Sequence, residues 1–135
     1  MTRFVIDAPT LVHLVTEDVA VAPAHRLVAP QALRSQALDL LYGAVRRGEL
    51  TEREALQHHE TMTGVKVRLL GDRVSRRVSW QLARELDLDS TAAAEYLAVT
   101  RLQADLFVSV DAAARALAEG VVPVGTVDQL SIPTT

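Results

Sequence analysis

The chain has 135 residues, of which 49% are hydrophobic and 23% are charged, and its formal net charge is −3. This length predicts one domain, over residues 1–130, followed by a C-terminal tail at 131–135. The charge excludes a general polyanion binder, and the lack of cysteine excludes disulfides, thiolate metal sites and cysteine nucleophiles. No stretch resembles a membrane span or a secretory signal, so we expect a cytoplasmic protein with no membrane partner.

Short apolar runs rich in β-branched residues predict buried strands, and apolar residues three or four positions apart predict amphipathic helices. The predicted elements are, in chain order, a strand at 3–6, a helix at 8–17, a strand at 26–28, a helix that starts at Pro30 and stops at Gly48, a helix from the Thr51 capping box to Gly64, a strand at 65–70, helices at 74–86 and 92–102, a strand at 106–110, a helix at 111–118 and an edge strand at 121–124. This alternation predicts an α/β fold with a parallel sheet covered by helices on both faces. In the helix after Pro30 the predicted buried face consists of Leu33, Ala37, Leu40, Leu41 and Ala44.

Two aspartates each follow a predicted strand, near opposite ends of the chain. Asp7 comes directly after the strand at 3–6, and Asp111 directly after the strand at 106–110. Open α/β sheets place their functional crevice outside the carboxyl ends of the strands, so two such carboxylates could share a metal site there. The alternative is that each aspartate only caps the helix that follows it.

Gln36 lies on or beside the buried face of its predicted helix. A polar side chain in that position needs a hydrogen-bond partner. Either it bonds to a neighbouring strand end, or it occupies a position that once carried a carboxylate.

Five arginines fall within a short stretch and could follow a phosphate backbone. They are Arg68, Arg73, Arg76, Arg77 and Arg84. The interspersed acids Asp72 and Glu85 favour a solvated helix face instead.

The histidine pair and the large aromatic residues do not form a recognisable site. The pair His58 and His59 lacks the H-E-x-x-H spacing of a zinc helix, which indicates a surface pair. Trp80 and Tyr96 are interpreted as core or interface anchors.

Five segments in this order and spacing resemble one known family, the PIN domains of the VapC type, which are the toxin half of VapBC toxin–antitoxin modules. The matching segments are Val5-Ile6-Asp7-Ala8, Ala29-Pro30-Gln31-Ala32-Leu33, Arg46-Arg47-Gly48-Glu49-Leu50-Thr51, Ala94-Glu95-Tyr96-Leu97-Ala98 and Phe107-Val108-Ser109-Val110-Asp111.

The resemblance implies a PIN-like three-layer α/β/α sandwich with a central, mainly parallel sheet. It also implies a nuclease that cuts single-stranded RNA with one or two Mg²⁺ or Mn²⁺ ions held by acidic residues. Hard divalent cations prefer oxygen ligands, and they activate a water and stabilise charge on the scissile phosphate. The partners implied are a second copy of the chain in a homodimer, a VapB-like antitoxin and RNA.

By position, Asp7 and Asp111 match the first and last family acids and would be the catalytic and metal-binding residues. The two acids expected between them are replaced by Gln36 and Ala93. Loss of two negative charges should weaken a Mg²⁺ site severely. The possible substitutes are Asp39, Asp89 and Ser109, the first two each about one helical turn from the replaced position.

The sequence therefore leaves three hypotheses for the function open. The first is a degenerate PIN-like domain with weak or lost nuclease activity, retained for binding or as a toxin–antitoxin component. The second is an active Mg²⁺-dependent endoribonuclease toxin that uses a reduced or displaced set of acids. The third is a PIN-like fold with an unrelated small-ligand site in the same crevice.

Overall fold

A computed structural model describes residues 1–132 and shows a central sheet of parallel strands. The strands are β1 (Arg3–Ile6), β2 (Arg26–Pro30), β3 (Arg68–Leu70) and β4 (Leu106–Val108), in the spatial order β3-β2-β1-β4. In register, Val5 of β1 lies opposite Val28 of β2 and Phe107 of β4. The strands of this sheet therefore end on the same side, as the sequence predicted.

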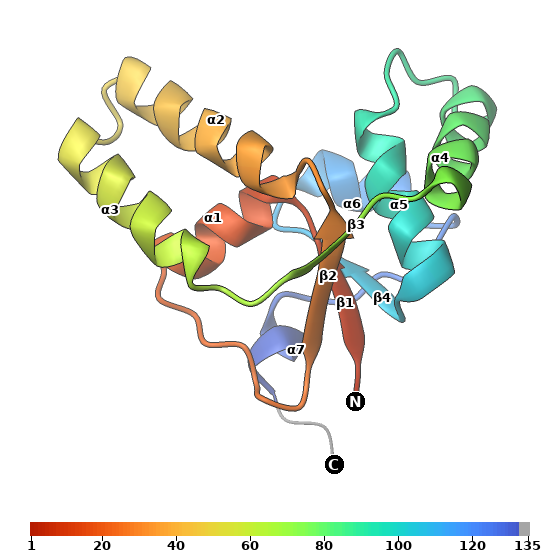
Figure 1. The fold of residues 1–135 in the computed structure, drawn as a ribbon, viewed down its shortest axis with the longest axis horizontal. Coiled ribbons are helices and arrows are strands. Elements are labelled where there is room, and N and C mark those ends of the chain that lie inside the picture. Colours follow the sequence, from red (N-terminus) through yellow and green to blue (C-terminus); the bar gives the residue numbers. More distant parts are fainter. Residues whose placement is uncertain (133–135) are drawn as a thin grey trace.

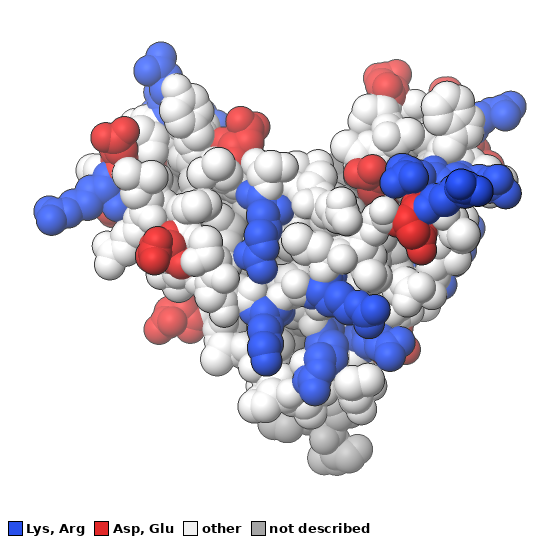
Figure 2. All heavy atoms as spheres, viewed as in Figure 1, with Lys and Arg blue, Asp and Glu red and all other residues white. Residues whose placement is uncertain are grey.

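Helices cover both faces of the sheet, which confirms the predicted three-layer α/β/α sandwich. They are α1 (Ala8–Thr16), α2 (Leu33–Arg46), α3 (Glu52–Thr63), α4 (Arg73–Glu85), α5 (Ala92–Gln103), α6 (Ala112–Ala118) and α7 (Asp128–Ser131). Helices α1, α2 and α3 pack together on one side, while α4 packs on α5, which lies against β1, β2 and β4. The two groups form the arms of a V, and the carboxyl ends of the strands point into the hollow between them (Figures 1 and 2).

The core forms where the alternation of the sequence predicts it. Residues Phe4, Val5 and Ile6 of the inner strand β1 are almost fully buried. Thr51 caps α3 through the predicted capping box, in which its side chain and that of Glu54 bond to each other's backbone N–H.

Several predicted boundaries were wrong. Pro30 ends β2, opposite Leu70, and α2 begins only at Leu33. Leu40 is 39% exposed and Ala44 is half-buried, whereas Leu41 beside Leu40 is 3% exposed, so the buried face of α2 is narrower than predicted. In the predicted strands, residues 65–67 and 109–110 are not part of β3 or β4.

The C-terminal region differs from the prediction in a similar way. Residues 121–124 form no strand, although Val124 makes one isolated parallel bridge to Phe107, beside the outer edge of β4. The short helix α7 was not predicted, and its last residue, Ser131, belongs to the predicted tail. Residues 133–135 of that tail lie outside the described residues. Within residues 1–132 no helix is both long and apolar enough to cross a bilayer.

Candidate functional site

Asp7 is held at the carboxyl end of β1, where both oxygens of its buried carboxylate accept hydrogen bonds. The residue has extended backbone geometry and is the N-cap of α1. Its Oδ1 accepts hydrogen bonds from the Thr10 backbone N–H and the Thr10 hydroxyl, and its Oδ2 accepts one from the Ser109 hydroxyl at 2.6 Å. Burial raises the pKa of Asp7, and the hydrogen bonds from Ser109 and Thr10 oppose that rise.

Ser109 connects the two aspartates. While its hydroxyl donates to Asp7, the same oxygen accepts the backbone N–H of Asp111 at 3.0 Å. Thr10 adds a second link, because its hydroxyl oxygen accepts the backbone N–H of Val110 at 3.1 Å. The ends of β1 and β4 are thus tied together, as expected from the parallel sheet.

The carboxylate of Asp111 has a different environment. The residue is exposed and is the N-cap of α6, and its Oδ2 accepts the Ala114 backbone N–H at 2.9 Å. Both aspartates therefore act as helix caps, which was the structural alternative considered for each of them. The Asp7 carboxylate is also the acceptor of two buried hydroxyl groups.

A small crevice of about 200 Å³ lies beside Asp7. Its lining includes the two positions at which the family resemblance implies acids, Gln36 from α2 and Ala93 from α5. The other lining residues are Ala8, Pro9, Ala92, Tyr96, Leu97, Phe107, Ala114 and Leu117. Segments far apart in the sequence therefore meet here, and Asp7 is the one carboxylate among these lining residues.

Gln36 finds its partner in Tyr96, one turn of α5 beyond Ala93. The Tyr96 hydroxyl donates a hydrogen bond to Gln36 Oε1. Burial raises the pKa of Tyr96, and the negative charges of Asp7 and Glu95 raise it further, so this hydroxyl stays protonated. Gln36 therefore bonds to a helix side chain and not to a strand end, the partner that one interpretation of the sequence expected.

The predicted substitutes for the missing acids do not join Asp7 in the crevice. Asp39 and Asp89 are both exposed and neither lines the cavity, while Ser109 contributes a hydrogen-bond donor to Asp7. Within residues 1–132 no group of three or more His, Asp or Glu side chains is arranged to hold a metal ion. With one carboxylate and one neutral amide, the crevice fits a Mg²⁺ or Mn²⁺ site poorly, since such ions prefer several charged oxygen ligands.

Two contributors to this site were missed from the sequence. Thr10 occupies the third position of the helix that Asp7 caps, where a hydroxyl residue can reach back to the cap, and that spacing was an available signal. Tyr96 lies three residues after Ala93, so it had to share that face of α5. It is buried, as predicted for a core anchor, whereas Trp80 is 64% exposed and is no core residue.

Comparison with known proteins supports the fold alone. No family model matches the chain, and no curated protein matches it. The crystal structure of PAE2754 from Pyrobaculum aerophilum is similar, with a TM-score of 0.72 and 20% sequence identity over 96% of this chain and 93% of that chain. At this identity the similarity extends to the α/β architecture over nearly the whole length of both chains.

Proposed function

We propose that this chain is a VapC-like PIN-domain protein in which metal-dependent ribonuclease activity is weak or lost and which is retained for binding. The observation that carries the proposal is the composition of the crevice: Gln36 and Ala93 lie beside Asp7 at the positions where acids are expected. A neutral amide bonded to Tyr96 supplies no charge to a divalent cation.

The engagement of Asp7 supports the same proposal. Both of its oxygens already accept hydrogen bonds from Thr10 and Ser109. A cation would have to compete with these donors and would gain only one negative charge from this wall of the crevice. The alternative, an active Mg²⁺-dependent endoribonuclease toxin, would need Asp111 or distant acids to move toward Asp7.

An RNA-cleavage assay tests the activity. Wild-type protein and Asp7→Asn are incubated with single-stranded RNA in Mn²⁺, in Mg²⁺ and in EDTA. We expect no metal-dependent cleavage that distinguishes the two proteins. Cleavage by the wild type that requires the metal and is lost in Asp7→Asn would establish the active alternative.

The binding role is proposed for the partners that the family resemblance implies, a second copy of this chain and a VapB-like antitoxin. A symmetric pair is the commonest oligomer of soluble proteins. An antitoxin-like reading frame immediately upstream of the gene is the expected genetic context. Co-expression of that product with this chain should yield a stable complex, and failure of the two to co-purify would leave the toxin–antitoxin role without support.

A further inference from the structure

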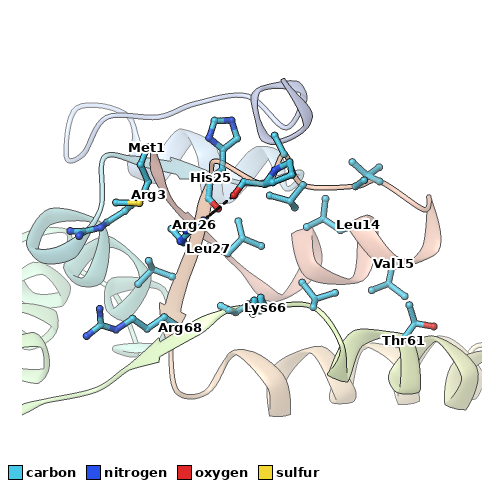
Figure 3. A pocket seen from close by; sticks show the side chains of 18 of the residues that line it. Met1, Arg3, Leu14, Val15, His25, Arg26, Leu27, Thr61, Lys66 and Arg68 are labelled. Carbon is cyan, nitrogen blue, oxygen red and sulfur yellow. Dashed lines mark hydrogen bonds between the residues drawn. The ribbon is translucent and has the colours of Figure 1, made fainter. Parts of the chain in front are cut away.

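A second, larger groove lies at the opposite end of the sheet from Asp7. Its volume is about 990 Å³, and it runs along the amino-terminal half of β2 and the segment that leads into β3 (Figure 3). Its lining also includes Met1, Arg3, Gln103 and Thr61 of α3. A groove of this volume is at the upper end of the range for protein ligand sites.

The groove exists because β3 is shorter than the sequence predicts. Its register with β2 begins only where Arg68 lies opposite Val28. Residues 65–67 bow away before that point, so Arg26 and Leu27 have no neighbouring strand on this side (Figure 1). The groove therefore lies beside a two-residue stretch of β2 without a strand neighbour, next to residues 65–67, while the N–H of Arg26 bonds to the Thr2 carbonyl oxygen on the β1 side.

One wall of the groove is cationic. Arg3 and Arg26 are register partners on neighbouring strands, so their side chains stand on the same face of the sheet. Arg68 is the register partner of Val28, which lies two residues after Arg26, so it shares that face. These three side chains are exposed, as is Lys66, which also lines the groove (Figure 3).

The other wall is aliphatic. Leu27 points to the opposite face from Arg26, toward Leu14 and Val15 of α1 (Figure 3). Further aliphatic lining residues are Val19, Val21, Val65 and Val67. The two walls thus face the two sides of a chain that would lie along the edge of β2.

Acids lie near this groove, since Asp105 Oδ2 accepts the backbone N–H of Arg3 at 2.8 Å, but within residues 1–132 no ion pair joins them to its basic side chains. Within residues 1–132 one ion pair is formed, between Arg47 and Glu49, far along α2 and its following turn. The guanidinium of Arg26 donates to the carbonyl oxygens of Pro23 and His25. Asp18 is the one carboxylate residue in the lining, and Figure 2 shows basic side chains gathered over this part of the sheet, with acidic ones on the flanks.

We propose that this groove binds an extended peptide segment of a partner protein in which acidic and aliphatic side chains alternate. Successive side chains of an extended chain point to opposite sides. One set would meet Arg3, Arg26 and Arg68, and the other would meet the wall around Leu27. In the recognition of extended peptides, alternate pockets for successive side chains give specificity.

RNA is the less suitable occupant. Sequence-tolerant binding of single strands combines basic side chains with aromatic ones on which bases stack. Among the described lining residues there is no Phe, Tyr or Trp, and the His25 ring packs edge-on against Phe4 with ring centroids 5.0 Å apart. The aliphatic wall instead matches the branched side chains of a peptide. The proposal is independent of the proposed function, since it uses no residue of the Asp7 crevice.

Fluorescence anisotropy with labelled peptides tests the proposed peptide binding. The probe is a short acetylated peptide of alternating glutamate and valine, and the comparison probes are the lysine–valine repeat, the glutamate–serine repeat and oligouridine. We expect the glutamate–valine peptide alone to bind at micromolar concentration. Its binding should weaken as salt is raised from about 50 mM to about 500 mM, because salt screens the pairs with arginine.

Charge-matched variants locate the binding. The double variant Arg26→Gln/Arg68→Gln should weaken binding roughly two- to thirtyfold, the range for loss of two surface ion pairs. The control Arg73→Gln/Arg77→Gln removes the same charge from exposed positions of α4 and should bind like the wild type. Thermal melting checks that both variants fold, and if the first does not, Lys66→Gln takes its place, since Lys66 lies outside the strands.

Each outcome decides the proposal. Binding of the glutamate–valine peptide that depends on Arg26 and Arg68, and not on the control pair, supports it. No binding up to about 1 mM, equal binding of the lysine–valine peptide, or equal loss in both double variants would overturn it. Binding of oligouridine in place of the peptide would make the groove a nucleic-acid contact and would also overturn it.

Discussion

Rebuilding the acidic cluster in the crevice tests the reasoning behind the candidate site. The double variant Gln36→Glu/Ala93→Asp adds two carboxylates beside Asp7. For carboxylates roughly 6 Å apart at an effective dielectric constant of about 20, each pair repels by about 3 kcal/mol before solvent screening and protonation reduce it. The free energy of unfolding of the metal-free variant should therefore fall by about 1–3 kcal/mol, and the pKa values of these acids should rise.

Mn²⁺ should reverse that loss, because a bound cation inverts the charge balance of the crevice. A free concentration 100 times the dissociation constant stabilises the folded state by about 2.7 kcal/mol. For a domain of this size that corresponds to a rise in Tm of about 8–11 °C. If the wild type binds with a dissociation constant near the metal concentration, it gains only about 0.4 kcal/mol, or about 1–2 °C.

Differential scanning calorimetry in about 1 mM Mn²⁺ and in EDTA measures this difference. The control variant Gln57→Glu/Ala24→Asp adds the same charge at exposed positions away from the crevice. If Gln36→Glu/Ala93→Asp gains no more Mn²⁺-dependent stability than the wild type and this control, then Gln36 and Ala93 are not vacated ligand positions. A wild-type shift of several degrees would show instead that the present residues already complete a metal site.

Two further predictions concern the contacts of Asp7, and a third concerns the homodimer that the family resemblance implies. In urea unfolding, Asp7→Ala should lower the free energy of unfolding by about 2–4 kcal/mol, and Asp111→Ala should lower it by about 0.5–2 kcal/mol. The reason is that only Asp7→Ala leaves buried hydroxyl groups without an acceptor. Equal losses in the two variants would contradict this prediction. Burial raises the pKa of Asp7 above 3.8, so the folded state holds this proton more tightly than the unfolded chain does. The stability of the wild type relative to Asp7→Asn should accordingly be highest below about pH 3.8 and fall as pH rises through the raised pKa, and a relative stability that rises instead would refute it. Light scattering at micromolar concentration should give the mass of a homodimer, and a purely monomeric mass would count against the family resemblance.

The sheet and the meeting of distant segments were predictable because they depend on patterns that the chain repeats. Buried runs such as Phe4-Val5-Ile6 and the helix signals between them left few arrangements besides a parallel sheet with helices on both faces. Once the strands are parallel, the residues after β1 and β4 must lie on the same side. The proximity of Asp7 to Ser109 and Asp111 follows from that topology.

What could not be predicted depends on tertiary contacts. Pro30 carries a helix-start signal, yet it ends β2 because Leu70 lies beside it in the sheet. The bond between Tyr96 and Gln36 joins residues 60 positions apart, and no local pattern marks it. The groove beside Arg26 arises from strand register, since residues 65–67 alternate like a strand and still do not pair.

The presence of Asp7 alone is weak evidence for catalysis, because its carboxylate also has a structural role. Its carboxylate caps α1 and accepts the hydroxyl of Ser109, and through Ser109 it joins the end of β1 to the loop before α6. A carboxylate of purely catalytic value can be replaced with loss of activity and little loss of stability. Replacement of a carboxylate that has this structural role should lower the free energy of unfolding as well as any activity. Stability measurements on Asp7 variants and metal response at Gln36 and Ala93 therefore answer separate questions, the first about the architecture that holds the crevice together and the second about the chemistry that the crevice can support.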